Sequence, residues 1–143
     1  MNPFRYPATV KADAAGFHLV TFPDVPEAGT DASTREEALR EAVDALIAAL
    51  GGYVRARRPI PQPSKAKPGQ VVVTLPTLVA AKLALYEAMH KAGLSNIELG
   101  RRLGSSEGAV RRLLDLDHRS HIDQVEAALQ ALGQRLVVDV QAA

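Results

Sequence analysis

The segment between residues 52 and 70 most strongly limits what this chain can fold into. It holds Pro59, Pro61, Pro63 and Pro68 together with five basic residues and no acidic one. Proline lacks a backbone N–H and fixes φ, so neither a long helix nor a central strand runs through such a stretch. We therefore expect two modules, residues 1–58 and 71–143, joined by a basic, extended linker at residues 59–70.

The net charge of +1 hides an uneven distribution. Residues 1–51 carry four basic and eight acidic side chains, whereas residues 71–143 carry eight of each. The absence of cysteine excludes disulfide scaffolds, thiolate zinc sites and cysteine nucleophiles, and it fits a reducing compartment. No stretch is apolar over the ~20 residues that a spanning helix needs, and the first residues lack a signal pattern. We therefore expect a cytoplasmic protein.

The first module shows strand periodicity followed by helix periodicity. Apolar residues alternate over residues 4–11 and dominate residues 17–22, which predicts an antiparallel hairpin, with a short third strand near residues 29–32. Pro7 indicates that the first strand lies at an edge or has a free donor side. Ser33 or Thr34 is expected to cap a helix that ends at Gly51. Its apolar face comprises Leu39, Ala42, Val43, Leu46, Ile47 and Leu50.

Four aspartates of this module could be read as a metal-binding cluster, as in nucleases: Asp13, Asp24, Asp31 and Asp44. Turn aspartates commonly bond their own backbone, and helix-surface carboxylates are solvated, so we do not expect a metal site. His18 has no nucleophile or carboxylate at a spacing that would make it a base. We expect neither a catalytic residue nor a cofactor.

The order of motifs in this module resembles the HicB family of antitoxins. The motifs are Tyr6-Pro7 before a hairpin, the turn Phe22-Pro23-Asp24-Val25-Pro26, the helix start at Thr34 to Ala38, and the proline-rich exit at Arg58 to Ser64. The resemblance implies a partial ribonuclease H-like fold without the nuclease acids. It also implies a partner, a small RNA-cleaving toxin of the HicA type.

The residue pattern of the second module predicts a mainly helical structure. Val71–Thr74 is a short strand signal, and Pro76 opens a helix that Gly93 closes. Ser95 and then Ser105 or Ser106 can cap two short helices. Gly100 and Gly104 suit a close helix approach and a turn with positive φ, respectively. The chain as a whole is thus predicted to be α+β: a small antiparallel sheet with one covering helix, then a helical module with short flanking strands.

The two short helices resemble a helix-turn-helix of the Xre or lambda-repressor-like type, with residues 106–114 as the recognition helix. Such a helix meets base edges with its N-terminal turn and outer face, and neighbouring cations meet phosphates. The same arginines could equally be the solvated face of an amphipathic helix. The candidate DNA-binding residues are Ser95, Arg101, Arg102, Ser105, Ser106, Glu107, Ala109, Arg111, Arg112 and Arg119.

The remaining segments suggest self-association rather than chemistry. His118 and His121 lack the further ligands that a zinc site needs. A helix is expected over residues 122–132, followed by a strand over Leu136–Val140. An apolar terminal strand has to pair, so residues 136–140 or 71–75 are candidate contacts of a homodimer or higher homo-oligomer.

Three functions of different classes fit these features. The leading hypothesis is an antitoxin that covers a HicA-type toxin and, as a dimer, binds operator DNA to repress its own operon. The alternatives are a stand-alone helix-turn-helix regulator whose first module senses a ligand or protein, and a metal-dependent nuclease. For the antitoxin hypothesis, the candidate toxin-binding residues are Asp24, Glu27, Glu37, Glu41 and Asp44.

Overall fold

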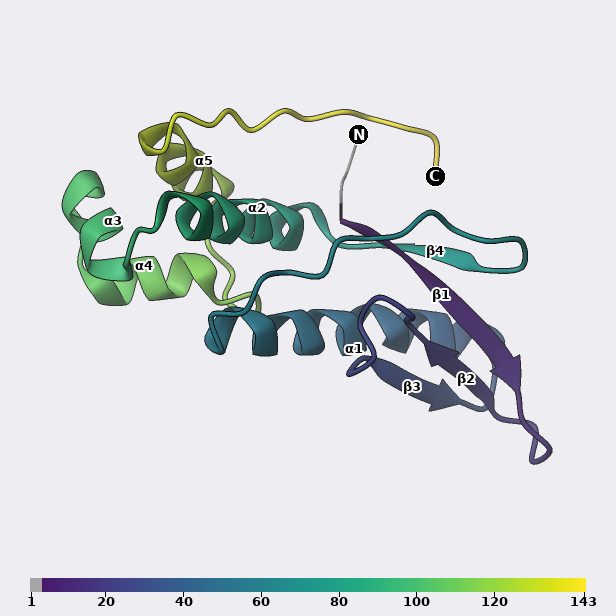
Figure 1. Cartoon of the computed structure of the whole chain (residues 1–143). Coiled ribbons are helices and arrows are strands. Elements are labelled where there is room, and N and C mark those ends of the chain that lie inside the picture. The colour runs from purple at the N-terminus through teal and green to yellow at the C-terminus, as the bar shows by residue number, and fades with distance from the viewer. Residues whose placement is uncertain (1–3) are drawn as a thin grey trace. The chain divides into compact units, whose positions relative to one another are not determined.

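The computed structural model describes residues 4–143, which divide into two compact units on either side of the Leu75–Pro76 bond (Figure 1). The fold is α+β, as predicted. The first unit contains β1 (Arg5–Ala12), β2 (His18–Thr21), β3 (Gly29–Ala32), α1 (Arg35–Arg55) and β4 (Val71–Thr74). The second contains α2 (Thr77–Ala92), α3 (Asn96–Leu103), α4 (Glu107–Leu114) and α5 (Ile122–Ala131).

The four strands form one antiparallel sheet in the order β3-β2-β1-β4. β1 is an interior strand, but its two neighbours pair with different halves of it. β4 pairs with Arg5–Ala8, and β2 pairs with Thr9–Ala12. Pro7 therefore lies opposite Val72 of β4, outside the part of β1 that pairs with β2. Its missing N–H costs the β1–β2 ladder nothing, which explains how a proline fits an interior strand.

Helix α1 packs on one face of the sheet and contributes to the core of the first unit. Thr34 caps it by accepting a hydrogen bond from the Glu37 backbone N–H at 3.1 Å. Ala38, Ala42, Leu46 and Leu50 follow at four-residue spacing and are fully buried. Small residues at the first two positions let the helix approach the sheet closely. Opposite them, the sheet contributes Tyr6, Ala8, Val20 and Val73.

The prediction that α1 ends at Gly51 is wrong. The helix continues through Gly51 and Gly52 to Arg55. Gly51 is buried inside the helix, and Tyr53 extends the buried face by one more turn. A glycine costs an interior helical position only about 1 kcal/mol, which the burial of a tyrosine ring outweighs.

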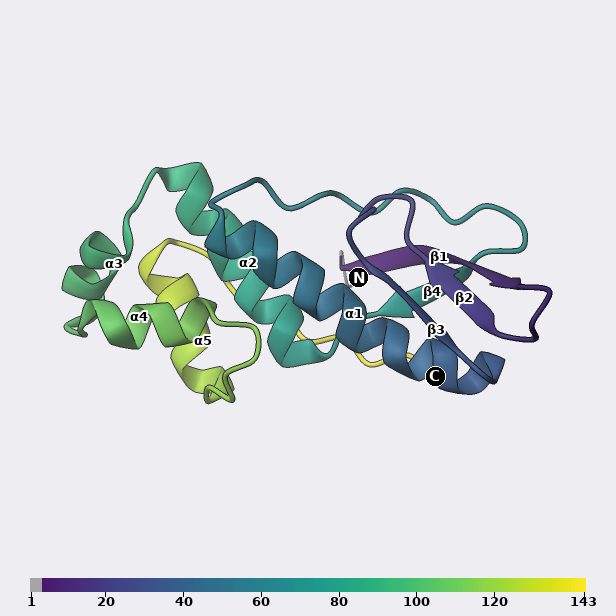
Figure 2. The same ribbon diagram turned by 90° about the horizontal axis from the view of Figure 1, so that it is seen from below.

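The expected linker is instead a structural part of the first unit. The Tyr6 hydroxyl donates to the Pro61 carbonyl at 2.8 Å, and the Asp24 carboxylate accepts from the Ser64 backbone N–H at 2.8 Å. Ile60 is buried. Residues 59–70, which we call the connector, thus carry the chain from α1 to the sheet edge where β4 pairs (Figure 2). The strand Val71–Thr74, assigned to the second module from sequence, completes the first sheet.

The second unit is a set of four helices around an aliphatic core. α2 contributes Leu83 and Leu85, and Leu99, Val110 and Val125 join them from α3, α4 and α5, all without solvent exposure. The predicted strand at Leu136–Val140 is not formed in the single chain: residues 134–143 have no regular secondary structure. Val137, Val138 and Val140 are between 74% and 90% exposed, so residues 4–143 leave these three valines of the predicted strand in solvent.

Within residues 4–143, no helix combines the length and apolarity required to cross a membrane.

Candidate functional site

Helices α3 and α4 are joined by a turn whose geometry depends on two glycines. Gly104 ends α3 in the left-handed region, at φ 66°. At Gly100, an added Cβ would lie 2.7 Å from the Ser105 carbonyl oxygen, closer than real Cβ contacts allow. Both predictions for these glycines are confirmed. Together they let the backbone of the turn pass directly against α3.

The N-termini of both helices are capped by serine. The Ser95 hydroxyl accepts from the Glu98 backbone N–H, and the Ser106 hydroxyl accepts from the Ala109 N–H, each at 3.1 Å. These bonds satisfy backbone donors that a helix start leaves open. The Ser95 and Ser106 hydroxyls are therefore occupied by their own helices, and Ser105 lies exposed between them.

The cations predicted for DNA contact remain open to solvent. Arg111 forms an ion pair with Glu107 on the preceding turn, with Nη2 2.8 Å from Oε1. Both side chains are exposed, so this pair contributes little to stability and can exchange for another anion. Of the predicted set, Ser95 and Ala109 are half-buried; the exposed members are Arg101, Arg102, Ser105, Ser106, Glu107, Arg111, Arg112 and Arg119.

A lysine that sequence reasoning missed fixes the end of α4. Lys82 of α2 is fully buried, and its ammonium donates to three backbone carbonyls: Arg112 at 2.9 Å, Asp115 at 2.7 Å and His118 at 2.8 Å. All three donors are used, which is the condition for burying an ammonium. Burial lowers the pKa of Lys82, and the nearby charges of Asp115 and Asp117 act in the opposite direction. The only sequence signal was a lysine within an apolar helical pattern.

The loop after α4 has no metal site. The His118 Nδ1 lies 3.1 Å from the Ser120 hydroxyl, which itself lies 3.3 Å from the Arg112 carbonyl. Among the described residues 4–143, no group of three or more His, Cys, Asp or Glu side chains is placed to hold a metal ion. Beside this loop, a cavity of about 210 Å³ is lined by Arg112, His118 and residues of α3, α4 and α5.

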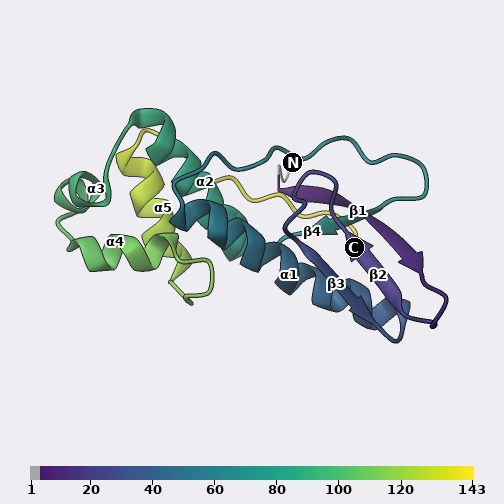
Figure 3. The ribbon, with the colours of Figure 1, turned by 60° about the horizontal axis from the view of Figure 1, so that its bottom comes forward.

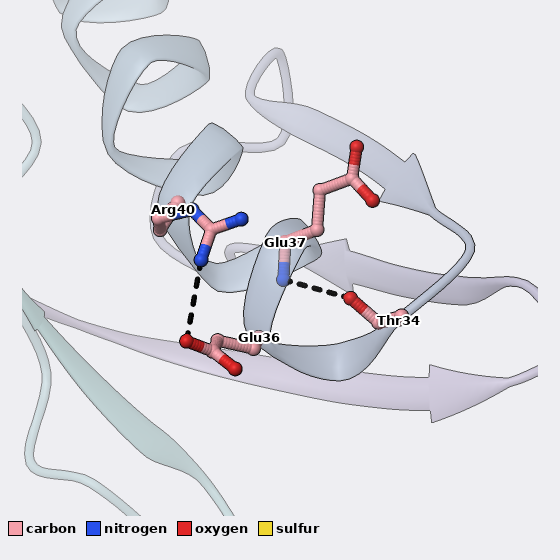
Figure 4. Close-up of polar contacts among 4 residues, drawn as sticks. All are labelled: Thr34, Glu36, Glu37 and Arg40. Carbon is pink, nitrogen blue, oxygen red and sulfur yellow. Dashed lines mark hydrogen bonds and ion pairs between the residues drawn. The ribbon is translucent and has the colours of Figure 1, made fainter.

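In the first unit, three of the five predicted toxin-binding acids share one face of α1. Glu37, Glu41 and Asp44 follow at spacings of four and three residues, opposite the buried face. Glu41 accepts a hydrogen bond from the Thr30 hydroxyl of β3 at 3.2 Å, which places this acidic face beside the β3 edge of the sheet. Figure 4 shows the Glu37 carboxylate pointing away from the neighbouring Glu36–Arg40 ion pair.

The other two predicted acids bind the connector and the last turn of α1. Asp24 holds the connector at Ser64, accepting from its hydroxyl at 2.9 Å as well as from its backbone N–H. Glu27 accepts from the Tyr53 hydroxyl at 2.7 and 2.8 Å, and Arg58 lies 3.6 Å from its carboxylate. The hydrogen bond from Tyr53 lowers the pKa of Glu27 and raises that of Tyr53. These carboxylates fasten the loop after β2 to the chain that leaves α1.

Comparison with known proteins gives one consistent family. Residues 5–84 match the model of the HicB_like antitoxin of bacterial toxin-antitoxin system. Antitoxin HicB 2 of Photorhabdus laumondii is 43% identical over 132 residues, which is 92% of this chain and 93% of that protein. Antitoxin HicB of Pseudomonas fluorescens is 43% identical over 84% of this chain and 83% of its own length.

A more distant relative, Antitoxin HicB of Escherichia coli K12, is 36% identical over 92% of this chain and 96% of its own length. The family match covers residues 5–75 of the first unit, including the connector and β4, and continues to residue 84, and the relatives extend the similarity over both units. The fold and these matches agree, and the chain belongs to the HicB-like antitoxins of bacterial toxin–antitoxin systems.

Proposed function

We propose that this antitoxin neutralises a HicA-type, RNA-cleaving toxin through the acidic face of α1. The observation that carries the proposal is the arrangement of the half-buried Glu37 and the exposed Glu41 and Asp44 on one stripe beside the β3 edge. A protein that binds RNA presents cations to phosphates, and a row of carboxylates offers those cations a substitute. The antitoxin acts by binding, without a catalytic group of its own.

A charge-matched pair of variants tests this face. In the full-length chain, Glu41→Gln/Asp44→Asn should slow association with the toxin encoded by the adjacent gene by about tenfold at low salt, because steering by complementary charge is lost. Asp123→Asn/Glu126→Gln removes the same charge from α5 of the second unit and should change the rate less than about twofold. Equal rates for the two double variants would refute the acidic face as the toxin contact.

We propose further that α3 and α4 form a helix-turn-helix that binds operator DNA and represses the toxin–antitoxin operon. Two features support this proposal: the tight turn at Gly100 and Gly104, and the exposed cations around α4. With α4 in the major groove, Arg111 can exchange its ion pair with Glu107 for two acceptors on a guanine edge. Arg101, Arg102 and Arg119 are assigned to phosphates.

A dimer suits this function because repressors of this kind read two half-sites. The exposed segment at residues 136–140 is the proposed contact, in which two copies pair as strands and bury the valines that a single chain leaves in solvent. The sheet edge at residues 71–75, the other candidate, already uses one side of its backbone to pair with β1.

Sequence preference tests the recognition helix. Arg111→Ala should lower the discrimination between operator and random duplex by about 1–3 kcal/mol. Arg101→Ala should instead lower the affinity for both duplexes by the same factor. An equal loss on the two duplexes for Arg111→Ala would remove its base-reading role. The neighbouring gene separates this reading from a stand-alone regulator, since an antitoxin of this kind lies next to a short gene for a basic protein. We place both proteins in the cytoplasm.

A further inference from the structure

Four cations lie on the first unit between the end of α1 and the start of β4, and we call them the basic ridge: Arg55, Arg57, Lys65 and Lys67. All four are exposed, and within the described residues 4–143 none of them forms an ion pair. No acidic residue occurs between Asp44 and Glu87 in the sequence. Arg58 is excluded from the ridge because it binds Glu27 and covers the Tyr53 ring at 4.3 Å.

The backbone that carries the ridge is held at several points. Besides the bonds at Pro61 and Ser64, the connector closes with a turn in which the Gln70 N–H donates to the Lys67 carbonyl at 3.0 Å. Pro68 and Gly69, the latter at φ 85°, occupy the two central positions that favour such a turn. The cations are therefore presented on an ordered backbone, which lowers the entropy lost when they bind an anion.

Arg57 occupies a position that would ordinarily favour glycine. Its φ is 55°, and among the described residues it is the only one other than glycine with a positive φ. The Arg57 N–H bonds the Val54 carbonyl and the Arg58 N–H bonds the Tyr53 carbonyl, which is the hydrogen-bond pattern of a Schellman helix end. A charged side chain at this strained position points to a function of the side chain itself.

The connector part of the ridge, which carries Lys65 and Lys67, and the acidic face of α1 belong to different sides of the same unit. Glu41 bonds β3 at one edge of the sheet, whereas Gln70 bonds Thr9 of β1 and leads into β4 at the other edge. Figures 2 and 3 show α1 on one side of β1 and the connector on the other. A basic toxin on the acidic face would be repelled by the ridge, so we assign the ridge to a polyanion.

We propose that the basic ridge binds the phosphodiester backbone of operator DNA. This inference rests on the proposed operator binding and extends it to a second, sequence-independent contact. Arg57 and Lys65 are eight positions apart, so a chain in the polyproline II conformation spans about 25 Å between them, or roughly seven base-pair steps. The connector leads directly into β4, and the second unit begins at Pro76, two residues after β4.

Salt dependence on a 40-base-pair duplex of random sequence tests the ridge in the full-length protein. Each phosphate contact contributes about 0.9 to the slope of log K against log salt. Lys65→Gln/Lys67→Gln should lower that slope by about 2 and weaken binding roughly tenfold near 0.1 M salt. Arg35→Gln/Arg40→Gln removes the same charge at the start of α1 and should leave the slope unchanged. Equal slopes for the two double variants would overturn the proposal, as would a wild-type protein that binds no duplex.

Variants of Arg57 provide a second test in the same experiment. Arg57→Gln should lower the slope by about 1, and Arg57→Lys should retain it. If Arg57→Gln weakened binding to a single-stranded RNA of the same length but not to the DNA duplex, DNA would be ruled out as the ligand. The two proposals are tested separately. An Arg111→Ala protein that keeps full operator preference refutes the base-reading role of Arg111, whereas an unchanged slope in Lys65→Gln/Lys67→Gln refutes only the ridge.

Discussion

The ammonium of Lys82 lies 2.7 Å from the backbone carbonyl of Asp115, 33 residues further along the chain. Two more carbonyls, of Arg112 and His118, complete its surroundings. A charged side chain of α2 thereby closes the C-terminal end of α4, where the helix dipole concentrates partial negative charge. The same bonds hold the loop that carries Arg119, so α4 and this loop are positioned together.

Lys82→Met should destabilise the second unit by about 2–4 kcal/mol, because three part-buried backbone carbonyls lose the hydrogen bond from the ammonium. Hydrogen exchange of the full chain measures this, with amides of α4 and the following loop exchanging first. Lys91→Met on the exposed end of the same helix is the matched control and should lie within about 0.5 kcal/mol of the wild type. Comparable losses for the two variants would show that the three bonds contribute little.

Gly100→Ala should destabilise the second unit by about 1–3 kcal/mol, since its Cβ would lie 2.7 Å from the Ser105 carbonyl oxygen. Gly108→Ala, on the adjacent helix, places a Cβ no closer than 3.7 Å to any side chain and should stabilise by up to about 1 kcal/mol. Thermal melts of the two variants should thus shift in opposite directions. A neutral Gly100→Ala would mean that the turn has room to move.

Glu27 makes the first unit sensitive to acid. The Tyr53 hydrogen bond lowers the pKa of Glu27 below 4.5, so the bond adds stability in full above that pH and loses it as the pH falls through the lowered pKa. The melting temperature of Tyr53→Phe should therefore fall below that of the wild type above pH 4.5, and the gap should close on further acidification. In a Glu27→Gln background the gap should not depend on pH in this range. A constant gap in the wild-type background would contradict the assignment.

Arg57→Gly should stabilise the first unit by about 1 kcal/mol, because glycine reaches φ 55° without the strain of a side chain. Arg57→Ala keeps the strain, removes the charge and should leave stability nearly unchanged. Chemical denaturation followed by circular dichroism measures both. If glycine gives no gain over alanine, the backbone at this position is not strained.

Local patterns predicted the local elements well. The caps at Thr34, Ser95 and Ser106 and the turn at Gly104 could be predicted because each depends on side chains within four residues. The same locality explains the wrong end of α1. Gly51 is a sound stop signal by itself, and only the distant Glu27, which bonds Tyr53, shows why the helix continues.

Long-range pairing was the part that sequence could not supply. A run of valines predicts a strand at residues 71–74 but does not identify its partner, and the partner lies 63 or more residues earlier, in β1. The acidic face of α1 follows from helical spacing alone, yet Asp24 and Glu27 look equally available until Ser64 and Tyr53 are placed beside them. Lys82 was missed for the same reason: its three acceptors are backbone atoms of another helix end and loop.

The connector brings β4 back to the first sheet, and this determines when the first unit can finish folding during synthesis. Because β4 covers the Arg5–Ala8 half of β1, that half of the sheet waits for residues 71–74 to leave the ribosome. A chain interrupted inside the connector would keep every acid of the acidic face of α1 and still lack the strand that closes its sheet. Translation must therefore pass Leu75 before any antitoxin molecule has a complete first unit, whether or not the helices that follow are ever synthesised.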